Sequence, residues 1–239
     1  TNYEEESNRL YRGLEGELFE DATDLLGVGA GSIPLVGWGA GFEDFDSDGD
    51  RDLVVANGHI FDNISSWQAG GKYLQPCLFY RCDRGPRTRF VSVGSKLPAL
   101  NVPRAHRGLA TADYDCDGDV DLAVLSLDGP LVLLENTTPQ GSYLAIGISG
   151  LGPGGRDAVG TRVDVTTASG VHTRWIIGGG SYLSASSPEL HFGLGPDPVQ
   201  AIRVTWPNGD VASVPPPELS PRLLIELSKY RGGDDPLKK

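Results

Sequence analysis

Two nine-residue windows of the sequence carry the same acidic pattern, Asp-x-Asp-x-Asp-Gly-Asp-x-Asp. They span residues 44–52 and 113–121, and together they hold ten of the 32 acidic residues of the 239-residue chain. Five carboxylates within nine residues repel one another, because unit charges about 4 Å apart cost roughly 4 kcal/mol at an effective dielectric constant of 20. The pattern therefore predicts two loops that each hold a cation.

Calcium is the cation that this spacing favours. Oxygen ligands at the first, third, fifth and ninth positions, a backbone carbonyl at the seventh and a glycine at the sixth suit a large, hard cation. Magnesium requires a rigid octahedral site, and zinc prefers histidine or cysteine ligands. We therefore expect two Ca²⁺ ions, with these candidate ligand residues: Asp44, Asp46, Asp48, Asp50, Asp52, Asp113, Asp115, Asp117, Asp119 and Asp121.

The two loops differ from an EF-hand. An EF-hand loop ends with a bidentate glutamate at position 12 and lies between two helices, whereas this position holds Val55 in one window and Val124 in the other. The apolar runs 53–56 and 122–125 that follow the loops are typical of buried strands. The sequence thus predicts calcium loops that connect strands, and a solvated acidic turn without an ion is the alternative.

Each acidic window belongs to a longer repeat. Segment 37–44 aligns with segment 106–113 at an offset of 69 residues, and Tyr11-Arg12 aligns with Tyr80-Arg81 at the same offset. A third, partial copy starts at Leu133, and the first copy carries an insertion between Gly58 and Pro76. Repeats of this size made of short strands are typical of propeller blades or a related β-array.

These segments resemble two known families. Residues 37–52 and 108–121 resemble FG-GAP repeats, the calcium-loop blades of integrin-like β-propellers. Several later motifs are similar to the UnbV/ASPIC module that ends cartilage-acidic-protein-like chains: Asn57-Gly58-His59, Gln75-Pro76, and the run from 155–160 through 179–184 to 191–195. The resemblance implies a secreted or cell-surface, calcium-loaded protein without catalytic activity, in a family whose members usually carry several more blades.

The repeat pattern stops near Gln140. Alternating apolar residues then predict six short strands, at 143–148, 161–167, 171–177, 189–193, 201–206 and 222–227. Asn208-Gly209 is a strong hairpin signal, and this density of short strands favours a β-sandwich. The predicted fold class is therefore all-β, a partial β-propeller followed by a β-sandwich. We expect calcium-binding blade repeats over residues 1–139, an UnbV/ASPIC-like sandwich over 140–229 and a loose polar tail over 230–239.

Composition restricts the partners. The chain has 20 basic and 32 acidic residues, a formal net charge of −12, and no run of lysine or arginine, so a nucleic-acid partner is excluded. The uncharged stretch Leu25–Phe42 has the length of a membrane span but holds six glycines and a proline, so we expect sheet and turn and no transmembrane segment. Cys77, Cys82 and Cys116 lack metal-site spacing; they are expected to be ordinary small side chains or to form at most one disulfide.

No catalytic residue is predicted. The four histidines and the serines form no recognisable Ser/His/Asp arrangement, and no serine lies in a Gly-x-Ser-x-Gly turn. We interpret His59 as a structural hydrogen-bonding residue that does not line a site. Glu43 is expected to be solvated or to lie behind the calcium ligands, and Gly178–Gly180 to form a strand corner that binds no phosphate.

Three function classes remain. The favoured one is a calcium-stabilised binding or assembly module, a non-catalytic subunit of a cell-surface or periplasmic complex. It is expected outside the cytoplasm, because cytosolic calcium is too low for weak extracellular-type sites. The second is a carbohydrate-binding, lectin-like module, which an exposed Trp38 or Trp67 near a calcium loop would support. The third is a calcium-assisted hydrolase.

The predicted partner follows from strand counting. Two to three blades cannot close a ring, so the strands near Leu10–Tyr11 and Leu131–Leu134 are expected to have open edges. Such edges are usually covered or paired in stable proteins, and strand addition is a known recognition mode. We expect another protein chain to complete or cover the blade edges, with a glycan as the second class of partner. The alternative is a compact monomer whose N-terminal segment folds back over the edge; the chain starts at Thr1 and contains no methionine, which indicates a processed start or an excerpt.

Overall fold

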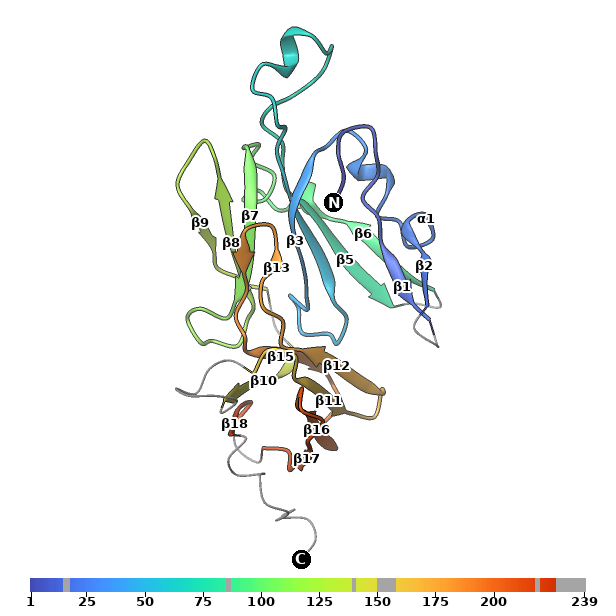
Figure 1. Cartoon of the computed structure of the whole chain (residues 1–239), viewed down its shortest axis with the longest axis vertical. Coiled ribbons are helices and arrows are strands. Elements are labelled where there is room, and N and C mark those ends of the chain that lie inside the picture. Colours follow the sequence, from blue (N-terminus) through green and yellow to red (C-terminus); the bar gives the residue numbers. More distant parts are fainter. Residues whose placement is uncertain (15–17, 85–86, 139–140, 150–157, 218–219, 227–239) are drawn as a thin grey trace, which may run out of the picture.

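The computed structural model describes residues 1–14, 18–84, 87–138, 141–149, 158–217 and 220–226. These residues form an all-β structure of several sheets, none of which closes on itself (Figure 1). The helical segments among them are short: α1 (Thr23–Leu26) and the 3-10 turns η1 (Ala30–Ser32), η2 (Ile64–Ser66) and η3 (Gly94–Lys96). None of the described helices is long and apolar enough to cross a membrane. The tail 230–239 and motif residues 155–157 lie outside the described residues.

The two acidic repeats fold into two similar antiparallel sheets. The first contains β3 (Gly37–Glu43), β4 (Asp52–Asn57), β5 (Leu78–Arg84) and β6 (Thr88–Ser92) in sequence order. The second contains β7 (His106–Ala112), β8 (Asp121–Ser126) and β9 (Val132–Leu134). The first strand of each sheet carries a register shift at the same place in the repeat, between Gly37 and Ala40 and between His106 and Gly108. The 69-residue offset therefore corresponds to a structural repeat.

A separate hairpin precedes these sheets. It pairs β1 (Tyr11–Gly13) with β2 (Phe19–Asp21) in antiparallel register, and β5 pairs with β6 in the same way. The alignment of Tyr11-Arg12 with Tyr80-Arg81 is thus an alignment of two hairpins. Of the uncharged stretch Leu25–Phe42, the first two residues end α1 and the last six lie in β3.

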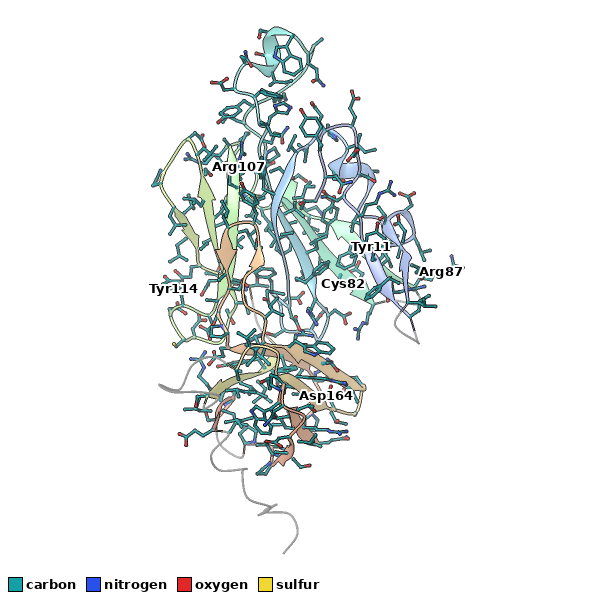
Figure 2. The ribbon with its side chains drawn as sticks, in the orientation of Figure 1. Tyr11, Cys82, Arg87, Arg107, Tyr114 and Asp164 are labelled. Carbon is teal, nitrogen blue, oxygen red and sulfur yellow. The ribbon has the colours of Figure 1, made fainter. Side chains whose placement is uncertain are left out.

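The two repeat sheets approach each other closely along β3 and β7. A Cβ atom added to Gly39 would lie 2.8 Å from Leu109 Cβ and 2.9 Å from the Arg107 carbonyl oxygen. Leu109 belongs to an apolar cluster that both sheets share, with Val54 from β4 and Val124 from β8. Glycine at position 39 is needed because any side chain would separate the two strands. Figure 2 shows Arg107 between the two sheets, where its guanidinium stacks 4.2 Å above the Trp38 ring.

The C-terminal region consists of two sheets packed on one apolar core. One sheet has the order β15 (Leu190–Gly195), β10 (Ser142–Ser149), β18 (Arg222–Glu226); the other has the order β12 (Val171–Trp175), β11 (Arg162–Thr166), β16 (Ala201–Thr205), β17 (Val211–Val214). Buried residues from both sheets, including Ile146, Val163, Phe192 and Ile202, form the core. The six expected strands are confirmed, and the Asn208-Gly209 turn connects β16 to β17, a strand that the pattern did not predict.

A short hairpin from the C-terminal region lies against the two repeat sheets (Figure 1). It pairs β13 (Gly180–Ser181) with β14 (Ser184–Ala185). Ser181 Oγ accepts a hydrogen bond from the Ala40 amide of β3 (3.2 Å), and Ser184 Oγ accepts one from the Leu109 amide of β7 (3.2 Å). The hairpin of β13 and β14 therefore covers part of the first strand of each repeat sheet. Counting strands in the sequence did not predict this contact.

The N-terminal segment also contacts β3. The Gly37 amide donates to the Asn2 carbonyl (3.1 Å), and Thr1 Oγ1 donates to the Trp38 carbonyl (3.2 Å). The N-terminal segment thus folds back against β3, as in the compact-monomer alternative. It does not pair with β9, which is the last strand of its sheet.

Candidate metal centre

The first acidic loop connects β3 to β4 and turns tightly around the carboxylate of Asp44. This carboxylate accepts hydrogen bonds from the amides of Asp48 (3.1 Å) and Gly49 (2.9 Å). The turn requires positive φ at Ser47 (54°) and Gly49 (99°), a conformation that glycine adopts without steric cost. One carboxylate oxygen from each of Asp44, Asp46 and Asp48 then lies within 4.8 Å of the other two.

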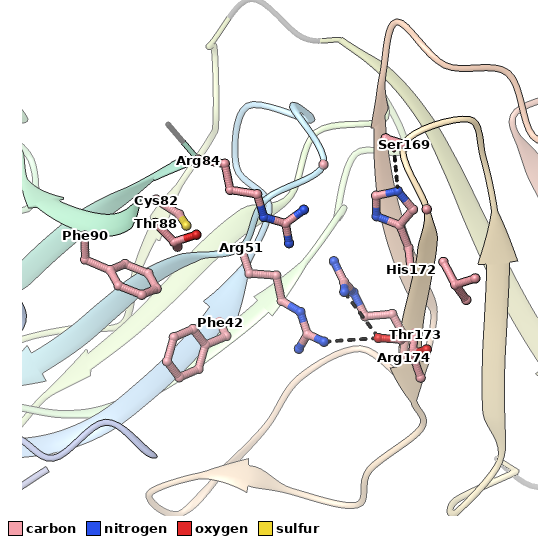
Figure 3. A pocket seen from close by; sticks show the side chains of 13 residues that line it. Phe42, Arg51, Cys82, Arg84, Thr88, Phe90, Ser169, His172, Thr173 and Arg174 are labelled. Atoms are coloured by element: carbon pink, nitrogen blue, oxygen red, sulfur yellow. Dashed lines mark hydrogen bonds between the residues drawn. The ribbon is translucent and has the colours of Figure 1, made fainter. Parts of the chain in front are cut away.

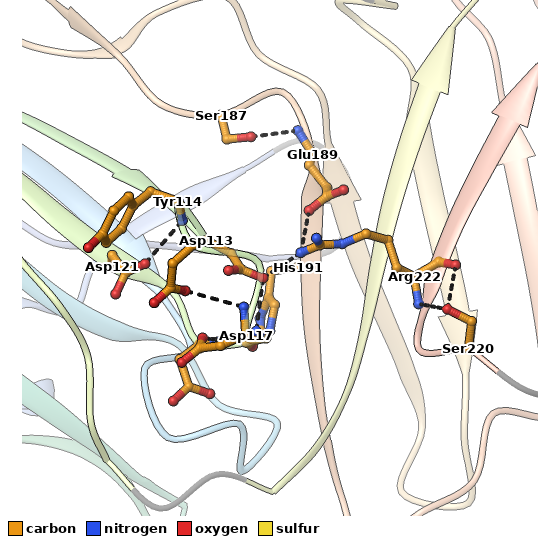
Figure 4. Close-up of polar contacts among 12 residues, drawn as sticks. Asp113, Tyr114, Asp117, Asp121, Ser187, Glu189, His191, Ser220 and Arg222 are labelled. Carbon is orange, nitrogen blue, oxygen red and sulfur yellow. Dashed lines mark hydrogen bonds and ion pairs between the residues drawn. The ribbon is translucent and has the colours of Figure 1, made fainter.

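The second acidic loop connects β7 to β8 and has the same local geometry (Figure 4). The Gly118 amide donates to Asp113 (3.0 Å), and the Asp119 amide donates to Asp117 Oδ1 (2.9 Å). Cys116 and Gly118 have φ values of 66° and 105°. Here too, one carboxylate oxygen from each of Asp113, Asp115 and Asp117 lies within 4.8 Å of the other two.

The structure thus brings the first three aspartates of each loop together and places the last two differently. The ninth residue has a structural role: the Asp52 carboxylate accepts the amides of Cys82 (2.8 Å) and Phe45 (3.3 Å). Asp121 likewise accepts the amides of Asn136 (2.8 Å) and Tyr114 (3.0 Å). These bonds leave each carboxylate oxygen a second lone pair for a cation.

The seventh residues lie outside the three-carboxylate groups. Asp50 forms an ion pair with Arg84 at 2.7 Å. Asp119 is the equivalent residue of the second loop, and its amide supports the turn. A contribution of these two residues through their backbone carbonyls remains a prediction.

The two carboxylate groups fit calcium chemically. Two oxygens that each lie 2.3–2.6 Å from one Ca²⁺ ion can be at most about 5.2 Å apart, and the observed limit of 4.8 Å is within that range. Asp113 Oδ1 is buried and has no hydrogen-bond partner among the described residues. A buried polar atom without a partner is costly, and a bound cation would satisfy it.

Burial perturbs the first loop strongly. It raises the pKa of Asp44 to about 7 and that of Asp52 to about 7, and neighbouring aspartates add to both shifts. Burial, followed by the charge of Asp48, also raises the pKa of Asp46. In the second loop burial raises the pKa of Asp121. Burial favours the protonated form of Asp44 and Asp52, so a cation that binds the first loop would displace protons from them.

The C-terminal region covers the first loop. The Gly195 amide donates to the Ser47 carbonyl (3.1 Å), and the Gly141 amide donates to the Asp46 carbonyl (3.4 Å). A Cβ atom added to Gly193 would lie 2.0 Å from Asp44 Oδ2. The backbone of β15 therefore lies in direct contact with the Asp44 carboxylate, which accepts the hydrogen bonds of the turn.

The second loop is held by side chains. Arg222 from β18 forms ion pairs with Asp113 and with Glu189 (3.2 Å for the latter), and His191 Nε2 donates to the Gly118 carbonyl (2.9 Å). Tyr143 stacks on His191, with ring centroids 5.4 Å apart. Figure 4 shows Arg222 reaching the loop from the other side of the junction. Nothing in the acidic motif indicates these partners.

Asn136, which follows β9, connects the two loops. Its side-chain amide donates to the carbonyls of Phe45 (2.8 Å) and Val120 (3.2 Å), one in each acidic window. Together with its own amide bond to Asp121, these contacts place both candidate metal centres along one end of the repeat sheets, at the junction with the C-terminal region.

The other residues that the sequence singled out have structural surroundings. His59 is buried and contacts Glu4 (3.2 Å) and the Phe61 amide (3.0 Å), as expected for a structural histidine. Glu43 is not simply solvated, because it accepts a hydrogen bond from Thr111 (3.0 Å) of the second sheet. Gly180 begins the hairpin of β13 and β14.

A Ser–His contact was missed by the sequence analysis. Ser126 Oγ lies 2.9 Å from His106 Nδ1, but both residues are buried, and His106 Nε2 lies 3.3 Å from the Val102 carbonyl. A nucleophile must reach its substrate, so this buried pair is structural. The three cysteines are free; Cys77 and Cys82 are buried and Cys116 is exposed.

Comparison with known proteins identifies the C-terminal region. Residues 152–230 match the family model described as ASPIC and UnbV. Cartilage acidic protein 1 of Mus musculus and that of Homo sapiens are each 36% identical to this chain over 174 residues, which is 70% of this chain and 25% of each relative. The Xenopus tropicalis protein of the same name is 35% identical over 109 residues, 44% of this chain and 16% of its own length. The chain spans about a quarter of the length of the first two relatives. The UnbV/ASPIC resemblance is therefore confirmed for residues 152–230, whereas the FG-GAP resemblance stays a prediction.

Proposed function

We propose that this chain is a calcium-stabilised extracytoplasmic binding or assembly module, a non-catalytic subunit that uses its repeat sheets to dock onto another protein. The observation that carries the proposal is the pair of three-carboxylate groups at the junction between the repeat sheets and the C-terminal region. Ions at these positions would neutralise carboxylates that otherwise repel one another within each loop, next to the C-terminal region. Calcium would then hold the two regions in one arrangement.

The proposed location follows from the same groups. Calcium sites of extracellular modules bind weakly and need the high free calcium found outside the cytoplasm, and the similar proteins carry the name cartilage acidic protein 1. We place the working compartment outside the cytoplasm, in a secreted, cell-surface or periplasmic setting.

In this proposal the two repeat sheets are FG-GAP-type propeller blades. Supporting evidence comes from the two faces of the second sheet. Leu122 and Val124 of β8 are buried on one face, whereas Leu125 and Leu133 on the other face are about half exposed, 48% and 47%. Propeller blades are packed on both faces by their neighbours, so among the described residues this apolar face lacks the neighbour that a blade would have.

The exposed leucines define the proposed docking surface. Leu127 and Leu131, in the turn between β8 and β9, are 66% and 61% exposed. We group these two leucines with Leu125 and Leu133 as one apolar patch next to β9, the edge strand. A β-sheet of another polypeptide, stacked on this face and covering the edge of β9, is the occupant that suits both features.

Sedimentation and native pull-down test the subunit proposal. In calcium the chain should be recovered with a partner, or self-associate, through this leucine patch. The double variant Leu131→Glu/Leu133→Glu should abolish that association, and Val211→Glu, an exposed position on β17, should not. A stable, well-folded wild-type monomer near 25.4 kDa that recovers no partner would contradict the proposal.

A lectin-like function is the second candidate, because the insertion after β4 exposes aromatic residues. Trp67 is 59% exposed and contacts Phe61 edge-on, with centroids 5.6 Å apart. The insertion lies at the opposite end of β4 from the first acidic loop (Figure 1), so direct glycan ligation by calcium is not expected there. Glycan-array binding that is lost in Trp67→Ala and retained in chelator would support this candidate; array binding lost in chelator would instead place the sugar at a calcium loop.

A further inference from the structure

A cleft of about 410 Å³ lies between the first repeat sheet and the hairpin that joins β11 to β12 (Figure 3). Arg51 from the first acidic loop and Arg84 from β5 line it from the repeat sheet, and His172 and Arg174 line it from β12. No aspartate or glutamate is among the described residues that line the cleft. A concentration of three guanidinium groups is unexpected in a chain with a net charge of −12. The cluster adjoins the first acidic loop, because Gly49 and Arg51 belong to window 44–52 and Arg84 pairs with Asp50.

Two of the guanidinium groups have no carboxylate partner. Arg51 Nη2 and Arg174 Nη1 both donate to the Thr173 carbonyl, at 3.2 and 3.3 Å. In the part of the chain that the structure describes, no carboxylate oxygen lies within 4.0 Å of either group, whereas Arg84 is paired with Asp50. Arg174 Nε is buried and has no acceptor there.

The burial of these charges has a cost that an anion would remove. Burial, followed by repulsion from Arg51, lowers the pKa of Arg174 to about 10. Glu43 and Asp44 face the two arginines from β3 and the first loop and moderate this repulsion. Their carboxylates lie beyond ion-pair distance, so the donors of both guanidinium groups that do not bond to the Thr173 carbonyl stay available. Paired guanidinium groups with free donors are suited to binding a carboxylate or sulfate in a fixed orientation.

The first repeat sheet also contributes aromatic rings to the cleft. Phe42 from β3 and Phe90 from β6 pack edge-on with centroids 6.1 Å apart, and Phe42 is 38% exposed. The volume is within the range of small-molecule sites. Charged donors and a ring surface in the same cleft favour a ligand that has both an oxyanion and a flat or apolar face.

We propose that this cleft binds a small anionic ligand, with its oxyanion between Arg51 and Arg174 and its ring or apolar face against Phe42. A sulfated monosaccharide and an aromatic carboxylate share this chemistry. The site adjoins the first candidate calcium loop, because Arg51 lies between Asp50 and Asp52. Its own binding groups are arginines that are not calcium ligands, so the ligand can be titrated separately once the chain is saturated with calcium.

Isothermal titration of the calcium-saturated chain with three probes tests the proposal: glucose 6-sulfate, benzoate and inorganic sulfate. One of the two ring-bearing probes should bind at one site per chain, more tightly than inorganic sulfate. Tighter binding of glucose 6-sulfate would identify the ligand's oxyanion as a sulfate group, and tighter binding of benzoate would identify it as a carboxylate. If neither binds, or if inorganic sulfate binds as tightly as both, the proposed site for an oxyanion and a ring does not exist.

Three variants locate the binding. Arg51→Gln and Arg174→Gln should each weaken it by at least about tenfold, the effect of losing a charge-assisted hydrogen bond. Arg203→Gln, which removes one exposed charge from β16, should leave it unchanged. Arg174→Lys keeps the charge, serves as a second variant if Arg174→Gln fails to fold, and should also weaken binding because the paired donors are lost. Equal weakening by Arg203→Gln would show non-specific attraction and overturn the proposal.

Discussion

The two acidic loops have the same sequence pattern and the same backbone turn, yet they lie in different electrostatic surroundings. Asp44 of the first loop is 1% exposed, beneath the backbone of β15, and burial raises its pKa to about 7. In the second loop, Asp115 and Asp117 are exposed and Arg222 pairs with Asp113. The motif therefore determines the arrangement of the carboxylates. The packing of the C-terminal region determines how strongly the carboxylates of each loop hold protons, and whether a protein cation such as Arg222 competes with a metal ion for them.

The largest expected effect is that of calcium removal. A site held at a thousandfold over its dissociation constant stabilises the folded state by about 4 kcal/mol, so excess chelator should lower the melting temperature markedly. Asp48→Ala and Asp117→Ala form a matched pair, since both are exposed residues that supply the third carboxylate of their loop. Each should reproduce the loss of one site, and Asp48→Ala should lower the melting temperature more, because Asp44 of the first loop is buried whereas Asp115 of the second is exposed.

Differential scanning calorimetry with and without chelator measures these effects. A melting curve that does not change in excess chelator would contradict a structural role for calcium. Equal shifts for the two variants would contradict the difference between the loops.

The second effect concerns the close packing on the first loop. Gly193→Ala should destabilise the protein by about 1–3 kcal/mol, the usual cost of overpacking, because the added methyl would meet Asp44 Oδ2. Gly147→Ala is the matched control on the neighbouring strand β10, where the new methyl meets a single flexible atom, Leu224 Cδ1, at 3.3 Å. Urea denaturation in calcium distinguishes the two; similar midpoints would show that β15 can move away from the loop without cost.

The third effect is a pH dependence of the calcium-free protein. The folded pKa values of Asp44 and Asp52, about 7, lie above the ordinary value of 3.8, so between about pH 4 and 7 the folded chain binds more protons than the unfolded chain. These two groups therefore lower the stability as pH rises through this window. In chelator, the urea midpoint should be higher at pH 5 than at pH 7.5.

Asp44→Asn should reduce this slope, and Asp117→Asn should leave it nearly unchanged. A midpoint that rises from pH 5 to pH 7.5 in the wild-type, calcium-free chain would show that the first loop is hydrated and that its acids titrate normally.

The smallest effect is expected from Arg222. Its guanidinium bonds to Asp113 and would repel a cation in the second loop, but it is partly exposed, which limits the interaction to about 1 kcal/mol. Arg222→Gln should therefore raise the calcium affinity of the second loop about fivefold and leave the first loop unaffected. Arg162→Gln, in an ion pair with Asp164 remote from the loops, is the control. An unchanged or weaker affinity in Arg222→Gln would mean that the arginine positions Asp113 for the ion.

Much of the fold could be predicted because local pattern determined it. The six strands after residue 140 and the Asn208-Gly209 turn follow from alternation and turn chemistry, and the 69-residue offset located the two repeat sheets. The hairpin of β13 and β14 could not be predicted, since its two-residue strands have no periodicity. Its position depends on hydrogen bonds from Ser181 and Ser184 to distant strands.

The candidate metal centres were predictable in part for the same reason. Aspartate spacing identified Asp44, Asp46 and Asp48 and their counterparts, because these residues meet within one turn. The ion pair of Arg222 with Asp113 joins residues 109 positions apart, and the cleft arginines Arg51 and Arg174 also come from different regions. Contacts of this kind depend on how the two regions pack, which no local pattern encodes.

The most direct test of the account is a calcium titration of the wild-type chain and the two loop variants. Isothermal titration calorimetry, performed at pH 6.5 in two buffers of different ionisation enthalpy, counts the ions and the protons that they displace. The account predicts two Ca²⁺ ions for the wild-type chain and one for each of Asp48→Ala and Asp117→Ala, with proton release that is largely lost in Asp48→Ala. Zero or one ion for the wild-type chain would contradict it.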